Sequence, residues 1–210
     1  MLRQALWGGI ASGMMVGIGG TVYLSCENKV VGAVLFAVAL LVICILGLYL
    51  YTGKIGLLIE NPSKKSAIAL AVGLAGNAIG AILTGILAAI AKPSLVDVAA
   101  TACEGKLEGG MIRGLIAAIF CGVLMYAAVK TYALRGTLVG IIFCIPTFIL
   151  CGFEHSVADM YYFTVASLAK FDPMSIVFIL VAVVGNTLGG WFLPVLTGLA
   201  KGKEQGNGAK

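Results

Sequence analysis

The run 151-CGFEHSVADM-160 places three ionisable residues within an otherwise apolar part of the chain. His155 is the single histidine among 210 residues, Glu154 precedes it, and Asp159 follows four positions later. The segment on the N-terminal side is apolar up to Leu150. Ionisable groups are costly to bury among apolar residues, so their presence at this depth indicates a functional site.

The rest of the chain has the composition of a multi-pass membrane protein. Hydrophobic residues make up 60% of it and charged residues only 11%, whereas soluble domains are roughly half apolar and a quarter charged. A bilayer core requires about 20 apolar residues per helix. Six transmembrane helices are predicted from the stretches that carry no Asp, Glu, Lys or Arg: 4–26, 30–53, 66–91, 114–129, 136–153 and 173–200.

The ends and interruptions of these segments refine the prediction. The fourth helix is expected to begin near Gly109 and to tolerate Arg113, whose long side chain can reach the membrane interface. The fifth stops being apolar at the quoted run and resumes at 161–168, so we interpret it as one crossing built from two half-helices. Segment 4–26 lacks a short apolar core followed by a small-residue cleavage site, which favours a spanning helix over a signal peptide. The polar segment 201–210 is expected to be a cytoplasmic tail without fixed structure.

The charges predict an orientation and exclude some partners. With the N-terminus inside, nine of the 14 basic residues fall on the inner side, which favours cytoplasmic termini in the cell's inner membrane. The net charge of +5 comes without a basic stripe interleaved with aromatic residues, so no nucleic-acid partner is expected. The six cysteines show no spacing typical of a metal site, and neither a metal nor another cofactor is expected.

An internal repeat divides the chain in two. The segments 73-GLAGNAIGAILTG-85 and 182-AVVGNTLGGWFLP-194 share the motif G-N-x-x-G, in the third and sixth predicted helices. Because three is an odd number of crossings, the second copy must run through the membrane upside down, as in many transporters. We therefore expect two inverted three-helix repeats, at about 4–91 and 109–200. The motifs either pack helices together or line a pore, and the small residues favour packing.

In each repeat, the helix before this motif contains a predicted interruption. In the second repeat the interruption is Pro146 followed by the quoted run, and in the first it is 47-GLYLYTGKIG-56 with its three glycines. Irregular backbone at membrane depth persists only where it is buried in protein or lines a cavity, and paired interruptions indicate a substrate path. Two broken helices are thus expected to meet near the midplane, one contributing Thr52 and the other His155.

The run G-F-E-H-S-V-A-D-M resembles the signature G-[FY]-E-H-S-x-A-N-M of the formate/nitrite transporter family. The resemblance extends over nearly the whole chain, including the Y-T-G stretch, 113-RGLIAA-118 and both G-N-x-x-G segments. It implies a homopentamer of aquaporin-like protomers in the lipid bilayer, each with its own pore for small monovalent anions or their acids, such as formate, nitrite or hydrosulfide. Three residues depart from the family pattern, namely Tyr49 for a glutamate and Ala118 and Asp159 for asparagines. The L-Y-L-Y-T-G-K version resembles the hydrosulfide branch more than the others.

The resemblance also implies roles for individual residues. The pore centre is His155 with Thr52, supported by Glu154, Asn77 and Asn186. The apolar constrictions on either side of this centre are formed by Leu40, Tyr51 and Cys121 on one side and by Phe36 and Phe148 on the other. The basic residues that draw anions into the vestibules are Arg3, Lys130 and Arg135.

Elementary chemistry explains why such a pore needs a histidine. A bare anion in hydrocarbon faces a cost on the order of 20 kcal/mol, which its neutral conjugate acid avoids. An imidazole has an ordinary pKa of about 6.5, so His155 could donate a proton or a hydrogen bond to the substrate. Glu154 is expected to bind backbone donors at the helix break. Asp159 is expected in the solvated outer vestibule, in preference to a position below His155.

Two other classes of function fit the sequence less well. An aquaporin-like channel for neutral solutes would share the inverted repeats, but the sequence contains no N-P-A motif. An intramembrane enzyme would need a nucleophile or a metal set, which one histidine and scattered cysteines do not supply. We therefore expect a channel or transporter that depends on protons and small anions, and no enzyme activity.

Overall fold

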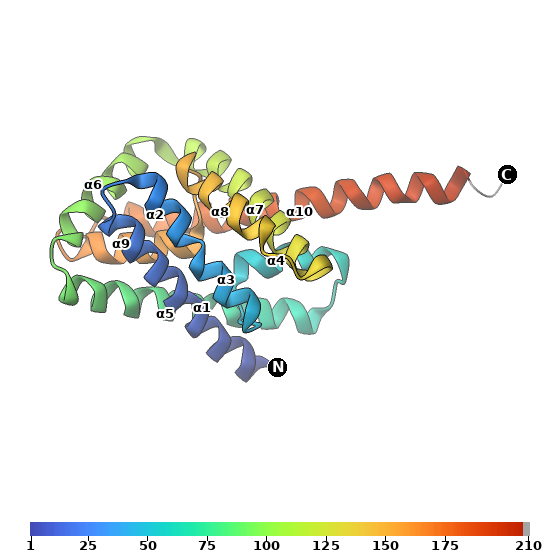
Figure 1. Cartoon of the computed structure of the whole chain (residues 1–210), viewed down its shortest axis with the longest axis horizontal. Helices are drawn as coiled ribbons and strands as arrows, with labels where there is room; N and C mark the ends of the chain where they lie inside the picture. Colours follow the sequence, from blue (N-terminus) through green and yellow to red (C-terminus); the bar gives the residue numbers. More distant parts are fainter. Residues whose placement is uncertain (208–210) are drawn as a thin grey trace.

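The computed structural model describes residues 1–207, and within these residues the chain is helical and contains no strand, which confirms the all-α membrane fold class (Figure 1). The helices are α1 (Leu2–Ser25), α2 (Lys29–Phe36), α3 (Val38–Ile45), α4 (Tyr51–Glu60), α5 (Lys64–Ala91), α6 (Leu95–Glu108), α7 (Gly110–Arg135), α8 (Val139–Leu150), α9 (Ser156–Ser167) and α10 (Met174–Asn207).

Four of the helices, α1, α5, α7 and α10, are long and apolar enough to cross a membrane. They pack as two pairs, α1 along α5 and α7 along α10. The glycines of the repeated motif make this packing possible. A Cβ atom on Gly80 would lie 2.0 Å from the carbonyl oxygen of Ile10, and one on Gly189 would lie 1.9 Å from that of Ile119. The motifs therefore lie at tight helix contacts, as small residues commonly do in membrane proteins.

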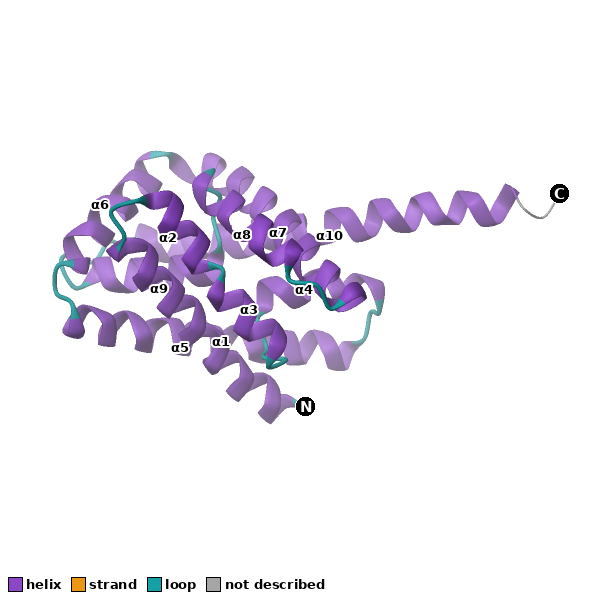
Figure 2. Ribbon diagram, viewed as in Figure 1, coloured by secondary structure: helices purple, strands orange, loops and turns teal. Residues whose placement is uncertain are grey.

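The predicted second helix is interrupted, but earlier than the glycine pattern suggested (Figure 2). The chain bends at Ala37, between α2 and α3, and leaves helical geometry between α3 and α4, where Gly47 has a φ of +63°. The expectation that Gly53 and Gly56 belong to the break is wrong, because both lie inside α4. Gly56 is needed there for packing, since a Cβ atom would lie 2.5 Å from the carbonyl oxygen of Gly190.

The predicted fifth helix is also interrupted, at residues 151–155 between α8 and α9. Gly152 takes a left-handed backbone conformation in this interruption, with a φ of +66°. Pro146 lies inside α8 and does not form part of the break, and α9 begins at Ser156, earlier than the expected aromatic cluster. The quoted run therefore spans a helix end, a loop and the first turn of a new helix.

Other boundaries differ from the prediction in smaller ways. The fourth crossing, α7, begins at Gly110, next to the expected start. The segment before it forms α6, a helix that the charge pattern did not predict. The tail expected at 201–210 is helical as far as Asn207, where α10 extends beyond the other helices in Figure 1. Residues 208–210 lie outside the described residues.

Candidate functional site

A buried asparagine holds the first helix break in place. Asn77 is fully buried, and its Oδ1 accepts a hydrogen bond of 2.8 Å from the backbone N–H of Tyr51. Its Nδ2 donates to the carbonyl oxygens of Tyr49 and Gly9, both at 2.9 Å. The backbone groups at a helix end have no intrahelical partner. One amide side chain, with one acceptor and two donor hydrogens, therefore satisfies a carbonyl group in the break and the first N–H of α4, and ties them to α1.

A second asparagine does the same at the other break. Asn186 Oδ1 accepts from the N–H of Ser156 at 2.8 Å, and Nδ2 donates to the carbonyl oxygens of Glu154 at 2.8 Å and Ala118 at 2.9 Å. The bonds to Gly9 and to Ala118 both span 68 residues of sequence. The two halves of the chain thus use the same hydrogen-bond pattern. This role was not predicted, because the motif alone indicates helix packing.

The two breaks bring Thr52 and His155 together. Thr52 Oγ1 lies 2.8 Å from His155 Nε2, and both side chains are buried. His155 is also the N-cap of α9, where its Nδ1 accepts a hydrogen bond from the backbone N–H of Ala158 at 3.1 Å. A ring nitrogen that accepts carries no proton, so the hydrogen bonds assign a neutral ring with its proton on Nε2. His155 then donates to Thr52, whose own hydroxyl hydrogen points to no other partner among the described residues.

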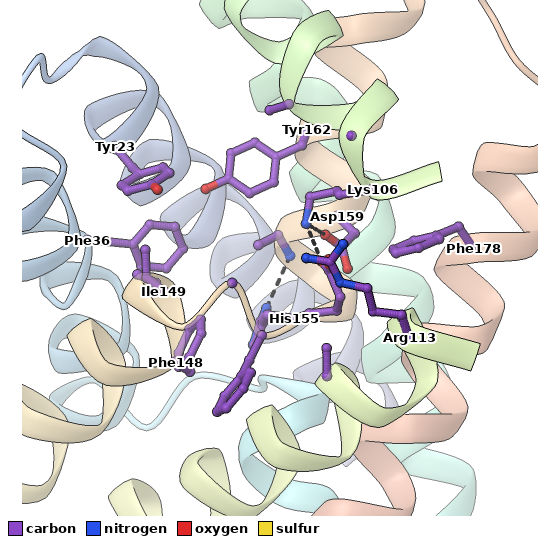
Figure 3. A pocket seen from close by; sticks show the side chains of 18 of the residues that line it. Tyr23, Phe36, Lys106, Arg113, Phe148, Ile149, His155, Asp159, Tyr162 and Phe178 are labelled. Atoms are coloured by element: carbon purple, nitrogen blue, oxygen red, sulfur yellow. Dashed lines mark hydrogen bonds and ion pairs between the residues drawn. The ribbon is translucent and has the colours of Figure 1, made fainter. Parts of the chain in front are cut away.

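On one side of this pair lies a cavity of about 280 Å³, which we call the Lys106 cavity (Figure 3). His155, Phe36 and Phe148 line it, and the ring centroid of Phe148 is 5.7 Å from that of His155 and 6.4 Å from that of Phe36. Figure 3 shows the two phenylalanines on one side of the cavity and Lys106 with Asp159 on the other. The apolar wall expected from Phe36 and Phe148 thus adjoins the histidine.

A second, smaller cavity of about 170 Å³, which we call the Lys54 cavity, lies at the start of α4. Leu40, Leu50, Gly53 and Lys54 are among the residues that line it. Gly53 follows Thr52 directly in the sequence and Leu50 precedes it by two positions, and Leu40 and Leu50 are almost completely buried. His155 therefore lines the Lys106 cavity, which also has phenylalanines in its wall, while close sequence neighbours of Thr52 line the Lys54 cavity, which has leucines in its wall.

Two expected constriction residues lie elsewhere. The Tyr51 hydroxyl forms a 2.6 Å hydrogen bond with Thr187 Oγ1 on α10, and its ring packs in a small cluster with Ile55 and Leu70. Cys121 is fully buried in the apolar core. Neither residue lines the Lys54 or the Lys106 cavity. The wall residue is Leu50, one position earlier, because α4 begins at Tyr51 and turns that side chain toward α10.

Both acidic residues of the quoted run pair with Lys106 on α6. The Lys106 ammonium group bonds to the Glu154 carboxylate and lies 3.1 Å from Asp159 Oδ1. Burial lowers the pKa of Lys106, but the two carboxylates raise it more, so that it lies above its usual value. The prediction that Glu154 binds backbone donors is wrong for its carboxylate, although its carbonyl oxygen accepts from Asn186. The prediction of a solvated Asp159 is also wrong, because only 1% of this residue is exposed.

The basic residues are distributed differently from the expectation. Lys130 is paired with Glu60, which also accepts a hydrogen bond from the Tyr126 hydroxyl. Arg3 and Arg135 are exposed near the ends of α1 and α7 and line neither cavity. The lysine of the second cavity is Lys54, whose ammonium lies 4.9 Å from the centre of the Tyr49 ring. The position of Lys54, two residues after Thr52 in the sequence, could have indicated that it lies near the site. Lys106 lies in a distant segment, and its position in the sequence did not indicate a place near the site.

The site contains no metal-binding group within the part of the chain that the structure describes. No cluster of three or more His, Cys, Asp or Glu side chains occurs there. The six cysteines are free thiols. The polar atoms near the Thr52–His155 pair instead suit the binding of a small solute through hydrogen bonds and charge.

Comparisons with known proteins agree with this architecture. The model of the family "Formate/nitrite transporter" matches residues 1–200. A solved structure described as "Pentameric formate channel with formate bound" is similar at 20% identity, with a TM-score of 0.79, over 95% of this chain and 97% of the other. A second, described as "FNT family ion channel", shares 21% identity, with a TM-score of 0.77, over 90% of this chain and 85% of the other. A comparison with curated protein sequences gives no match.

Proposed function

Because the chain belongs to the formate/nitrite transporter family, we propose that it is a channel for small monovalent anions or their conjugate acids. Formate, nitrite and hydrosulfide are the candidate substrates. Membership also confirms that this multi-pass membrane protein is a transporter and not an enzyme. The observation that carries the proposal is the buried Thr52–His155 pair, whose histidine lines the Lys106 cavity and whose threonine is followed directly by Gly53 and Lys54 of the Lys54 cavity.

The lysines supply the attraction for anions. Half-buried Lys54 has no carboxylate within ion-pair distance among residues 1–200, and the Tyr49 ring holds its ammonium group at the cavity wall. A cation on an aromatic face keeps its charge available to a further partner. In the Lys106 cavity the positive charge is shared with two carboxylates. An anion therefore has its stronger electrostatic site in the Lys54 cavity.

The Thr52–His155 pair provides hydrogen-bonding groups to a substrate that passes between apolar walls. Leucines line one approach and phenylalanines the other, so an unassisted anion would lose its hydration there. His155 donates to Thr52, which leaves the threonine hydroxyl free to donate to the substrate. Of the two roles expected for His155, this geometry favours hydrogen bonding over proton donation, because loss of the proton on Nε2 would leave an imidazolate.

Orientation and assembly form part of the same proposal. The distribution of basic residues favours cytoplasmic termini in the inner membrane, with the Lys54 cavity facing inward and the Lys106 cavity outward. The matched hydrogen bonds of Asn77 and Asn186 support two inverted repeats. The similar structure described as a pentameric formate channel supports a homopentamer, in which the exposed apolar helix faces would be covered by lipid or by neighbouring subunits.

Flux measurements in proteoliposomes test this function. Vesicles containing the protein should take up formate, nitrite or hydrosulfide faster as the pH falls, and should not swell in glycerol. Swelling in glycerol without anion flux would instead support an aquaporin-like channel for neutral solutes. Absence of any flux in folded protein would contradict both.

Replacing Lys54 with methionine should lower anion flux about tenfold. A partly buried charge–anion contact is worth roughly 1.5 kcal/mol, which corresponds to that factor. Lys54→Arg should retain most of the flux. The control is Lys64→Met. Lys64 is exposed at the start of α5, so this substitution removes the same charge without changing the cavity. Equal flux in Lys54→Met and Lys64→Met would show that Lys54 does not bind the anion.

A further inference from the structure

Asp159 is a buried carboxylate that is only partly paired. It lines the Lys106 cavity, is 1% exposed, and approaches the Lys106 ammonium with Oδ1 at 3.1 Å. Its Oδ2 atom accepts no hydrogen bond from any residue that the structure describes. In Figure 3, Asp159 lies beside Lys106 at the cavity wall. A buried polar atom without a partner is costly, so Oδ2 requires a proton, a water molecule or a ligand.

The charges around Asp159 do not balance when every group is ionised. Glu154, on the preceding loop, shares the same lysine, so two negative charges face one positive charge. Arg113 on α7 also lines the cavity, but it is exposed and forms no ion pair with either acid within residues 1–207. The other titratable groups that line the cavity are the hydroxyls of Tyr23 on α1 and Tyr162 on α9, and the neutral ring of His155. The buried thiols of Cys103 on α6 and Cys121 on α7 also face Asp159. The group of Lys106, Glu154 and Asp159 therefore carries one excess negative charge, which opposes an anion placed beside Asp159, while Arg113 supplies its positive charge from an exposed part of the cavity.

A proton on Asp159 removes this conflict. Oδ1 can still face Lys106, while a protonated Oδ2 becomes a donor for an anion in the cavity. His155 is unsuited to this task, because its Nδ1 accepts from Ala158 and its one proton is engaged with Thr52. Asp159 lies one helical turn from His155 and lines the same cavity, so the two groups can serve successive positions of one substrate.

We propose that Asp159 binds a proton when the anion of a weak acid enters the Lys106 cavity. Occupation by the anion and protonation of the carboxylate then favour each other, because an ionised Asp159 repels the anion whereas a protonated one donates a hydrogen bond to it. The inference rests on the proposed channel function and adds a specificity-determining residue to it. It also gives a physical meaning to the aspartate at a position where the family signature has asparagine.

The variant Asp159→Asn tests this inference, because asparagine has the same shape, no charge and a permanent donor. It mimics the protonated state at every pH. The measurement is formate flux of the variant divided by that of the wild type, in matched proteoliposomes from about pH 5 to about pH 8. The ratio cancels the protonation of formate itself. It should be close to one at low pH and rise at least about fivefold at high pH, where the wild-type carboxylate is ionised.

The controls separate this role from a structural one. Asp97→Asn removes the same charge from an exposed position on α6, and its ratio should stay near one at every pH. If Asp159→Asn does not fold, Glu154→Gln removes the excess charge by another route and should raise the high-pH flux in the same direction. A ratio for the folded variants that does not change with pH would overturn the inference alone. Wild-type vesicles without formate flux at any pH would overturn the proposed function and this inference with it.

Discussion

Replacing His155 with asparagine should lower anion flux about 10- to 100-fold while leaving the protein folded. Asparagine is a good N-cap and can still accept the hydrogen bond from the N–H of Ala158, so α9 keeps its start. It is too short to keep the 2.8 Å contact with Thr52 Oγ1. The threonine hydroxyl then loses the donor that orients it toward the substrate. A hydrogen bond to a charged group is worth about 1.5–3 kcal/mol, which sets the expected factor.

The variant Thr52→Val provides the matching measurement, because valine keeps the shape of threonine and removes the hydroxyl. Its flux should fall by a similar factor. The double variant should be little worse than Thr52→Val alone, since His155 acts through Thr52 and the two effects are not additive. Wild-type flux in His155→Asn, measured as formate uptake by proteoliposomes, would show that the ring is only a helix cap. Additive losses would show that His155 contacts the substrate independently.

The broad architecture could be predicted because the bilayer restricts what the backbone can do. Charge-free stretches indicate crossings, and a polar run within one of them indicates a break that other parts of the protein must cover. The meeting of Thr52 and His155 followed from this constraint, because irregular backbone at membrane depth occurs only in protected places. The local sequence also predicted the tight glycine contacts of both repeats, which the structure confirms.

Details that depend on distant partners could not be predicted. Lys106 lies 48 residues before Glu154, in a segment of mixed charge that gave no sign of this pairing. The burial of Asp159 depends on that lysine, so Asp159 alone gave no sign of it. The prediction placed Tyr51 at the cavity wall, where the structure has Leu50, and this error has a different cause. One residue of helix turns a side chain by about 100°, so a small error in the start of α4 changes which residue faces the cavity.

The asparagine of the repeated motif has a role that the neighbouring glycines do not indicate. Glycines on either side of Asn77 and Asn186 indicate close packing, and a polar residue in such a motif commonly forms a hydrogen bond between helices. In this fold each asparagine instead satisfies the backbone groups that the broken helices leave unpaired. Without it, the break that carries Thr52 or His155 would place bare N–H and C=O groups in an apolar interior. The two asparagines are therefore a condition for the site as well as for the packing.

Replacing either asparagine with alanine should cost about 3 kcal/mol of stability against unfolding in sodium dodecyl sulfate. Three hydrogen bonds are lost in each case, and the backbone groups left behind are buried. Because the two patterns match, Asn77→Ala and Asn186→Ala should differ by less than about 1 kcal/mol. Asn61→Ala is the control, since Asn61 is exposed at the end of α4. If the motif only packed helices, the smaller alanine would preserve the glycine contacts and both variants would be nearly as stable as Asn61→Ala. A loss confined to one asparagine would show that the two breaks are held by different means.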